Sequence, residues 1–554
     1  MLTGKTSRVL VAGAAVLCLA ACTGNSTTVS SSSSTPSSAA GANASTSPSS
    51  AVSSSAGTGS EGLTSVPGLP QEALDVMNQP QYALGQWAIS VRDIDTGEQI
   101  VSLHPDTLFE PASVTKTYST GAAWQELGPD STVTTPVKRT GEVTGGTLNG
   151  DLVLVGKGDI TMGGRTKPDG TVDFTNLDHN DANGIPGATL TTEDPLTGLN
   201  ELAAQVKASG INEVSGDVIV YDRLWQPHDL VGNPVTPIII NQNVIDFTTT
   251  ATTPGQPASI VMSPVVAPWQ IDNQVQTVEA GGKTQIKPTS TDEKTVTLTG
   301  TIAADSAPVV NVYLFKDPAT YARTAFIEAL GRAGVTVTAD PVATNPDSAL
   351  PPKADVDGLT SVAELTSLPL KEEITYINKI SYNNGGEAMF CRLAVAAGSD
   401  DCEQGLRKGQ EIWQAAGLDT NAVVLVDGSG LEGNYVTPNS QVQLQTIMAK
   451  RPDSQEWLDT LPILGVDGSL ATVQSTSPSA GKVFGKTGTL AAGDAFNDRY
   501  RLPVKALGGQ MDTEGGRHFA FAVFSTNSLY PDINGIFQAN DDVGKVVASI
   551  QQAY

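Results

Sequence analysis

Three short motifs stand in a fixed order along the chain, and together they constrain how it can fold. They are Ser113-Val114-Thr115-Lys116, Ser381-Tyr382-Asn383 and Lys486-Thr487-Gly488-Thr489. Each supplies the hydroxyl, amine or amide groups that acyl transfer uses. If they act together, Ser113 and Ser381 must meet although 268 residues separate them. The order therefore predicts one folded unit that is interrupted by a large insertion.

The first motif lies at the start of a predicted helix. Helical spacing begins after Pro111, and Gly128 is placed to end the helix. A spacing of three residues puts the hydroxyl of Ser113 and the amine of Lys116 on one helix face. Lysine can take a serine proton only if burial or a second cation lowers its pKa. We interpret Ser113 as a nucleophile and Lys116 as its base.

The other two motifs supply complementary chemistry. Lys486 would bring a second ammonium toward Lys116 and depress the pKa of the latter. Ser381 can pass protons, and Asn383 can hydrogen-bond a substrate amide. The threonines of the third motif, on a predicted strand, offer hydroxyls and backbone amides to a carboxylate and an acyl oxygen. The set describes acyl transfer that needs no cofactor.

Single motifs of this kind are common, and two of them recur in this chain. Ser479-Ala480-Gly481-Lys482 has the spacing of the first motif, and Ser525-Thr526-Asn527 has the spacing of the second. An isolated match is more often part of a surface helix, a cap or a turn. The ordered occurrence of all three motifs is what favours catalysis at Ser113.

The N-terminus carries an export signal. Lys5 and Arg8 precede an apolar run to Ala21 that is too short to span a bilayer, which predicts a signal peptide over residues 1–21. Leu19-Ala20-Ala21-Cys22 resembles the lipobox of bacterial lipoproteins, so we expect Cys22 to carry a lipid. The alternatives are ordinary secretion, with cleavage after a small residue, and a buried core segment. The expected location is extracytoplasmic, anchored to the cell membrane and within the cell envelope.

Composition identifies a tether and limits the partners. Residues 23–60 contain no charged residue and are mostly Ser, Thr, Ala, Gly, Pro and Asn, so we expect residues 22–60 to be a disordered tether. A flexible coil of this length reaches on the order of 35 Å. The formal net charge of −26 argues against a nucleic-acid partner.

Two cysteines remain for the folded part of the chain. Cys391 and Cys402 lie eleven positions apart, and an oxidising compartment favours a local disulfide between them. Two free thiols are the alternative. The four histidines lack paired ligand spacing, so no metal site is expected.

Further elements follow from periodicity and turn signals. We expect a hairpin over residues 87–103, short strands over 151–155, 217–221 and 295–301, and helices over 199–209 and 317–334. Helices should dominate from residue 359, followed by strands over 423–427, from 482 and over 518–525, and a last helix over 541–552.

The ordered motifs resemble the penicillin-binding protein and serine β-lactamase superfamily. The large separation between Ser113 and Ser381 narrows the likeness to the D-alanyl-D-alanine carboxypeptidase family typified by penicillin-binding protein 4, peptidase family S13. Further matching segments run from Gly150 to Gly156, from Asp427 to Leu431 and from Gly465 to Leu470. The likeness extends from about residue 70 to the C-terminus.

The resemblance implies a fold and its boundaries. A penicillin-binding transpeptidase-like α/β (α+β) domain, with an antiparallel sheet flanked by helices, is expected over residues 61–137 and 310–554. A β-rich insertion of one or two small domains is expected over residues 138–309.

It also implies roles for the site residues. The D-Ala-D-Ala end of a peptidoglycan stem peptide would acylate Ser113, with Lys116 as base and with Ser381 and Asn383 assisting proton transfer and alignment. The third motif, Lys486-Thr487-Gly488-Thr489, would hold the substrate carboxylate. The backbone N–H groups of Ser113 and Thr489 would form the oxyanion hole. Endopeptidase cleavage of the same peptides and covalent inhibition by β-lactams are further expectations.

Two positions depart from the family pattern, and two other functions compete. Gly386 stands before Glu387 where the family commonly has Ala, and residues 161–192 look long and irregular.

A class A β-lactamase would need a deacylating Glu with Asn four residues later. The requirement is not met by any of the glutamates between the second and third motifs, which are Glu387, Glu403, Glu411, Glu432 and Glu456. A non-catalytic scaffold that binds peptidoglycan or a protein partner is the remaining alternative, although its reactive side chains are complete.

Overall fold

The structure is a computed structural model that describes residues 63–554. The expected signal peptide, the lipid-bearing Cys22 and the tether over 22–60 lie outside these residues. No helix of the described part is long and apolar enough to cross a membrane.

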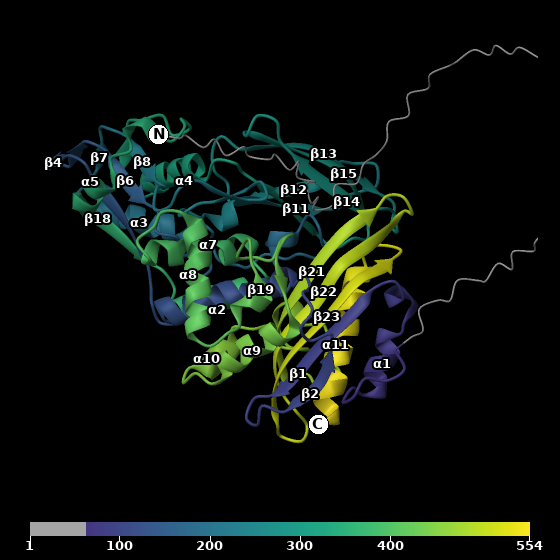
Figure 1. Cartoon of the computed structure of the whole chain (residues 1–554). Helices are drawn as coiled ribbons and strands as arrows, with labels where there is room; N and C mark the ends of the chain where they lie inside the picture. Colours follow the sequence, from purple (N-terminus) through teal and green to yellow (C-terminus); the bar gives the residue numbers. More distant parts are fainter. Residues whose placement is uncertain (1–62) are drawn as a thin grey trace, which may run out of the picture.

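A five-stranded antiparallel sheet forms the centre of the catalytic domain, with strand order β2-β1-β23-β22-β21. Its strands are β1 (Gln86–Asp93), β2 (Gln99–Leu103), β21 (Val483–Asp494), β22 (Arg499–Asp512) and β23 (His518–Tyr530). Figure 1 shows the early strands in purple beside the late ones in yellow, because β1 pairs with β23 along its full length. The two ends of the chain therefore build one sheet.

Helices cover both faces of this sheet. Alternate residues of β23 are apolar toward each side: Phe519, Phe521 and Val523 join one core, and Ala520, Ala522 and Phe524 join the other. The first core is covered by α1 (Gln71–Met77) and α11 (Gly535–Ala553). The second is covered by α2 (Lys116–Leu127), α6 (Leu370–Ile380), α7 (Asn383–Ala396), α8 (Cys402–Ala415), α9 (Pro438–Ala449) and α10 (Ser454–Asp459). This arrangement confirms the predicted fold class.

Some predicted elements have different bounds. Strand β22 was not expected, because Gly508, Gly509 and Pro503 weaken its local strand signal; pairing with both neighbours stabilises it. Helix α11 begins at Gly535 rather than at residue 541. The strand expected over 423–427 is reduced to β19 (Val423–Val424), which pairs with β20 (Tyr435–Val436).

The insertion contains two helix-covered sheets. One has the order β18-β3-β6-β8 and the other β17-β7-β5-β4. Their strands are β3 (Thr134–Arg139), β4 (Glu142–Thr144), β5 (Thr147–Asn149), β6 (Leu152–Val155), β7 (Glu213–Val214), β8 (Val218–Tyr221), β17 (Thr336–Val337) and β18 (Thr360–Thr366). Helices α3 (Thr197–Ala208) and α4 (Pro318–Arg332) pack into the same apolar core. A short helix, α5 (Lys353–Gly358), precedes β18.

Two further three-stranded sheets complete the β-rich insertion, which lies at the top of Figure 1. They are β12 (Ser259–Ser263), β11 (Val244–Thr250) and β16 (Val309–Leu314), and β13 (Gln270–Val278), β15 (Thr295–Ala303) and β14 (Gln285–Thr289). A hairpin of β9 (His228–Leu230) and β10 (Asn233–Val235) lies against α7, where the Asn384 amide donates to the Pro234 carbonyl over 3.2 Å.

The insertion is longer than residues 138–309. Strand β3 begins at Thr134, and β18 pairs with it antiparallel as far as Thr366. The core of the insertion includes Phe326 of α4 and Leu365 of β18. The chain therefore returns to the catalytic domain near Leu368 rather than at residue 310. Sequence periodicity could not locate this boundary, because α4 and β18 resemble the elements of either domain.

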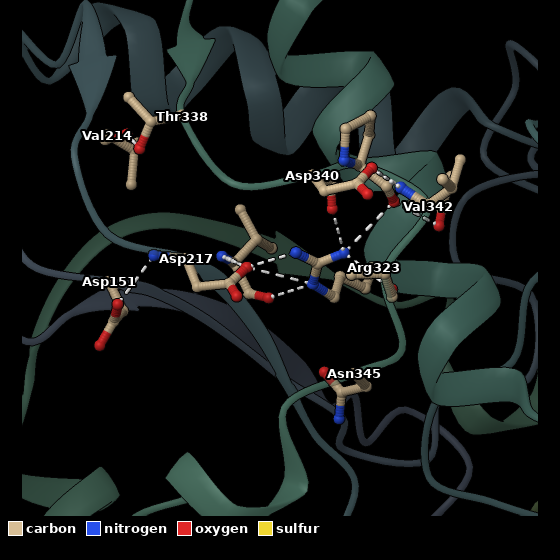
Figure 2. A network of polar contacts seen from close by, with 12 residues as sticks. Asp151, Val214, Asp217, Arg323, Thr338, Asp340, Val342 and Asn345 are labelled. Atoms are coloured by element: carbon tan, nitrogen blue, oxygen red, sulfur yellow. Dashed lines mark hydrogen bonds and ion pairs between the residues drawn. The ribbon is translucent and has the colours of Figure 1, made fainter.

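A buried arginine ties the late part of the insertion to the early part. Arg323 of α4 is fully buried and binds the Asp217 carboxylate at the start of β8. Its guanidinium also donates to the carbonyl oxygens of Asp340 and Ala343. Figure 2 shows Arg323 between Asp217 and the segment of Asp340, so three stretches of chain meet on one side chain. Loss of one partner would leave a buried charge unpaired.

Candidate active site

Ser113 lies in a tight turn that leads into α2. Residues Ala112–Thr115 form a single 3₁₀ turn, and the α-helix begins at Lys116. Ala112 has a φ of 46°, a left-handed conformation that is uncommon for a residue with a side chain. The carbonyl of Ala112 packs against Gly430, where a Cβ atom would overlap with it. The turn holds Ser113 half-buried, with its hydroxyl next to the helix start.

Lys116 is fully buried beneath Ser113. Its Nζ donates to Ser113 Oγ over 2.8 Å, to Asn383 Oδ1 over 2.7 Å and to the carbonyl oxygen of Ser429 over 2.8 Å. Burial lowers the pKa of Lys116 to about 7, while the carboxylates of Asp427 and Asp181 act against this shift. A neutral amine is therefore accessible near pH 7, and it can accept the proton of Ser113.

Ser381 and Lys486 form a second pair beside the first. Helix α6 ends at Ile380, and Ser381 takes the left-handed conformation that ends the helix, with φ of 64°. Lys486 Nζ donates to Ser381 Oγ over 3.0 Å and to the carbonyl oxygen of Thr487 over 2.9 Å. Burial, and after it the ammonium of Lys116, lowers the pKa of Lys486. The repulsion that we expected to act on Lys116 therefore acts on Lys486, whereas burial is the main cause for Lys116.

Edge strand β21 carries the third motif along the site. Gly488 allows the strand to approach the turn of Ser113, because a Cβ at this position would collide with the carbonyl oxygen of Pro111. Thr487 Oγ1 and Ser469 Oγ lie 2.7 Å apart, and Lys505 Nζ donates to Thr489 Oγ1 over 2.7 Å. Each threonine hydroxyl is thus held by a neighbouring side chain.

Exposure divides the site into two layers. Ser113, Ser381, Asn383 and Thr489 are half-buried, so their polar groups can meet a substrate. The lysines behind them, Lys116 and Lys486, are fully buried. Reactive groups therefore face outward, and the charges that tune them are shielded from water.

The irregular segment 161–192 of the insertion reaches this site. Arg165 pairs with Asp178 over 2.8 Å, and His179 Nδ1 lies 2.6 Å from Asp246 Oδ1, which fixes the segment to the insertion. Asn180 donates to the carbonyl oxygen of Ile380, the residue before Ser381, over 3.2 Å. Asp181 is thereby held close enough to act electrostatically on both Lys116 and Lys486.

Several contributing residues were not recognised as such from the sequence. Ser429 lies in the segment Asp427–Leu431, which the family likeness pointed to without giving it a role. Ser469 lies in a second such segment, Gly465–Leu470. Asp181 and Lys505 belong to no motif, and no local signal in the sequence marks them. Only the pairing of strands and the course of segment 161–192 place them at the site.

Close packing explains why position 386 is a glycine where the family commonly has Ala. A Cβ at this position would lie 2.7 Å from the carbonyl oxygen of Gly428 and 3.2 Å from Lys116 Cγ. The next residue, Glu387, accepts from the backbone N–H of Gly428 over 2.5 Å and contacts His228 Nε2 over 2.7 Å. One carboxylate oxygen therefore holds the segment of Ser429, and the other contacts the hairpin of β9 and β10.

Cys391 and Cys402 form a disulfide that joins α7 to the start of α8. They also lie near His228, and these three residues are the only group between residues 63 and 554 with ligand atoms close enough to hold a metal ion. Because the two sulfur atoms are bonded to each other, neither is available as a thiolate ligand.

The second Ser-x-x-Lys sequence has a structural role. Ser479 is fully buried and donates to Gln551 Oε1 of α11 over 2.6 Å. Lys482 lies at the surface and pairs with Glu514 over 2.5 Å. The two side chains do not form a pair, in contrast to Ser113 and Lys116.

Comparisons with known proteins agree with this geometry. The model of the D-Ala-D-Ala carboxypeptidase 3 (S13) family matches residues 71–540. A D-alanyl-D-alanine carboxypeptidase of Actinomadura sp. (strain R39) is 29% identical over 76% of this chain and 76% of its own length. The carboxypeptidase DacB of Mycolicibacterium smegmatis is 25% identical over 79% and 76%, respectively.

Solved structures show the same fold. The crystal structure of penicillin-binding protein 4 (dacB) from Haemophilus influenzae superposes with a TM-score of 0.63, at 20% identity, over 86% of this chain and 99% of that chain. The fold and the buried Ser–Lys pair define a serine enzyme of the penicillin-binding type. The chain belongs to the D-Ala-D-Ala carboxypeptidase S13 family, as its motifs predicted, and it is a serine-type D-Ala-D-Ala carboxypeptidase.

Proposed function

We propose that Ser113 is the acyl acceptor and that Lys116 activates it. Neutral Lys116 takes the Ser113 proton as Oγ attacks the carbonyl carbon between the two D-alanines of a stem peptide. The backbone N–H groups of Ser113 and Thr489 stabilise the oxyanion. The C–N bond then breaks as the proton that Lys116 took passes through Ser381 to the leaving D-alanine amine, which leaves Lys116 neutral and Ser381 unchanged. Water hydrolyses the ester and restores Ser113.

One observation carries this proposal. The Nζ of a fully buried lysine lies 2.8 Å from the hydroxyl of a half-buried serine, and burial lowers the pKa of that lysine to about 7. A lysine at the surface would stay protonated at neutral pH and could not act as a base. Asn383, at the start of α7, accepts a hydrogen bond from Lys116, and Lys486 of β21 donates to Ser381 beside the pair.

Mass spectrometry after treatment with a labelled penicillin tests the assignment. We expect a covalent adduct on the wild-type protein and none on Ser113→Ala or Lys116→Ala. Ser479→Ala and Lys482→Ala are matched controls, because they change the second Ser-x-x-Lys sequence, and they should label like the wild type. An unlabelled wild type, or a Ser113→Ala variant that labels equally, would refute the proposal.

Turnover distinguishes the enzyme from its two alternatives. Release of free D-alanine from a pentapeptide substrate would exclude an idle scaffold. Cross-linked peptide dimers in the same assay measure endopeptidase cleavage. A β-lactamase of class A would lose the penicillin adduct quickly, but no glutamate between the second and third motifs has the Asn four residues later that such deacylation needs. We therefore expect a long-lived adduct.

We also propose that the enzyme is exported and anchored to the membrane through a lipid on Cys22. The support is the basic start and apolar run of residues 1–21, which are typical of a signal peptide, and the Leu-Ala-Ala-Cys sequence that ends at Cys22. Radiolabelled palmitate should enter the wild-type protein, and the Cys22→Ala variant should stay unlabelled. Labelling of both proteins would contradict the anchor.

A further inference from the structure

Lys505 is a buried cation to which the mechanism above assigns no role. It lies in the middle of β22, and only 3% of its surface is exposed. Within residues 63–554 its ammonium has one hydrogen-bond partner, Thr489 Oγ1 at 2.7 Å, and no carboxylate forms an ion pair with it. An ammonium has three N–H donors, so two of them lack a partner in the described residues.

Burying such a group without a carboxylate is costly. An unpaired charge loses its hydration on burial and gains no opposite charge in return. The penalty is visible in the pKa of Lys505, which burial alone lowers to about 7. Lys505 also lies close enough to Lys486 to lower its pKa. The two ammonium groups therefore repel each other beside the third motif. An anion bound at this place would relieve both costs.

The sheet register aims this cation at the substrate side. Lys505 lies directly opposite Thr489 in the pairing of β22 with β21, so the two side chains share one face of the sheet. Thr489 is half-buried, whereas Lys505 is buried behind it. Because the Thr489 oxygen accepts an N–H from Lys505, its own hydrogen must point to another acceptor.

We propose that Lys505 is a positioning residue for the C-terminal carboxylate of the substrate. It turns the Thr489 hydroxyl outward as a donor, and it supplies positive charge behind that hydroxyl. The carboxylate group, rather than the peptide side chains, is the feature that this pair recognises. The inference rests on the proposed function, because it assumes that Ser113 is acylated by a peptide with a free carboxylate.

A pair of substrates that differ only in charge tests the role. One is an acyl-D-alanyl thioester whose leaving group ends in a carboxylate, and the other is the same thioester ending in a carboxamide. For Lys505→Met we expect the second-order rate constant of thiol release to fall about 10- to 100-fold with the carboxylate substrate, the scale of one charge-assisted hydrogen bond. The carboxamide substrate should change less than about twofold.

Further variants separate a positioning role from a structural one. Lys505→Arg should recover much of the preference for the carboxylate. In a Thr489→Val background, Lys505→Met should have little further effect, since it acts through Thr489. Lys482→Met, which changes an exposed lysine just before β21, is the matched control and should behave like the wild type.

Thermal unfolding gives an independent measurement. Because Lys505→Met removes an unpaired buried charge and keeps the side-chain volume, we expect its melting temperature to equal or exceed that of the wild type. A lower melting temperature, or an equal loss of rate with both substrates, would overturn the proposal. If the wild type forms no adduct with penicillin at all, the assignment of Ser113 fails instead, so the two failures are distinguishable.

Discussion

At the scale of single residues, the proposed base is a lysine rather than a histidine, and its burial lets it lose a proton near neutral pH. Lys116 makes three hydrogen bonds as an ammonium, to Ser113, Asn383 and the Ser429 carbonyl. When Lys116 loses one proton, its nitrogen gains a lone pair that can accept the hydroxyl proton of Ser113. Burial brings this step within reach at neutral pH, since it lowers the pKa of Lys116 from 10.5 to about 7.

The pH dependence of acylation should follow this group. Below pH 7 Lys116 is protonated and cannot take a proton, so the rate constant for penicillin acylation should rise with pH and level off above about pH 8. Stopped-flow measurement of adduct formation between about pH 5.5 and pH 8.5 checks it. A rate that is constant over this range would show that Lys116 is not the titrating base.

At the scale of elements, the site depends on how closely an edge strand can approach a turn. Strand β21 brings Lys486 under Ser381, and Gly488 lets it pass the carbonyl of Pro111. Helix α6 contributes through its end, where a left-handed Ser381 turns the chain into α7 and Asn383. Strand pairing with β22 then holds β21 at this distance.

Gly488→Ala should therefore damage catalysis more than stability. The added methyl group forces β21 away from the Ser113 turn, and a displacement of about 1 Å costs on the order of 100-fold in acylation rate. The overpacking should cost about 1–3 kcal/mol in the free energy of unfolding. Gly493→Ala on the same strand is the control, because a Cβ there meets no atom within 4 Å. Equal rates for the two variants would contradict the close approach.

At the scale of the whole molecule, the insertion is part of the catalytic environment. Segment 161–192 is held to the insertion by His179 and Asp246 and to the catalytic domain by Asn180 at the end of α6. The backbone N–H of Gly468, near the third motif, also donates a hydrogen bond to Asn176 Oδ1 over 2.8 Å. Asp181 therefore extends the influence of the insertion to the two buried lysines.

Replacing Asp181 by Asn should shift the pH profile to lower pH. The carboxylate of Asp181 raises the pKa of Lys116 against the effect of burial, so its removal lets that pKa fall further. Neutral Lys116 is then present at more acidic pH, and acylation should begin to rise earlier. Asp169→Asn changes an acid that is exposed like Asp181 but does not act on Lys116, and it should leave the profile unchanged. A shift toward higher pH would contradict this role of Asp181.

The three motifs and their order, which are read directly from the sequence, were enough to predict the interrupted domain and the family. This was possible because a nucleophile, a base and a carboxylate-binding strand need particular side chains at short, fixed spacings. The hairpin of β1 and β2 and the capped helix α4 were also predictable, since turn and cap residues act locally.

Only the tertiary structure decided what depends on contacts between distant segments. Strand β22 exists because β21 and β23 pair with it, and the insertion extends to Thr366 because β18 pairs with β3. Lys505 reaches Thr489 through sheet register, and Asp181 reaches Lys116 through a long segment of the insertion. From the sequence, Lys116 could be proposed as a base only on the condition that its pKa is lowered. Its burial, which lowers that pKa, depends on the packed molecule and not on the residues next to it in the chain.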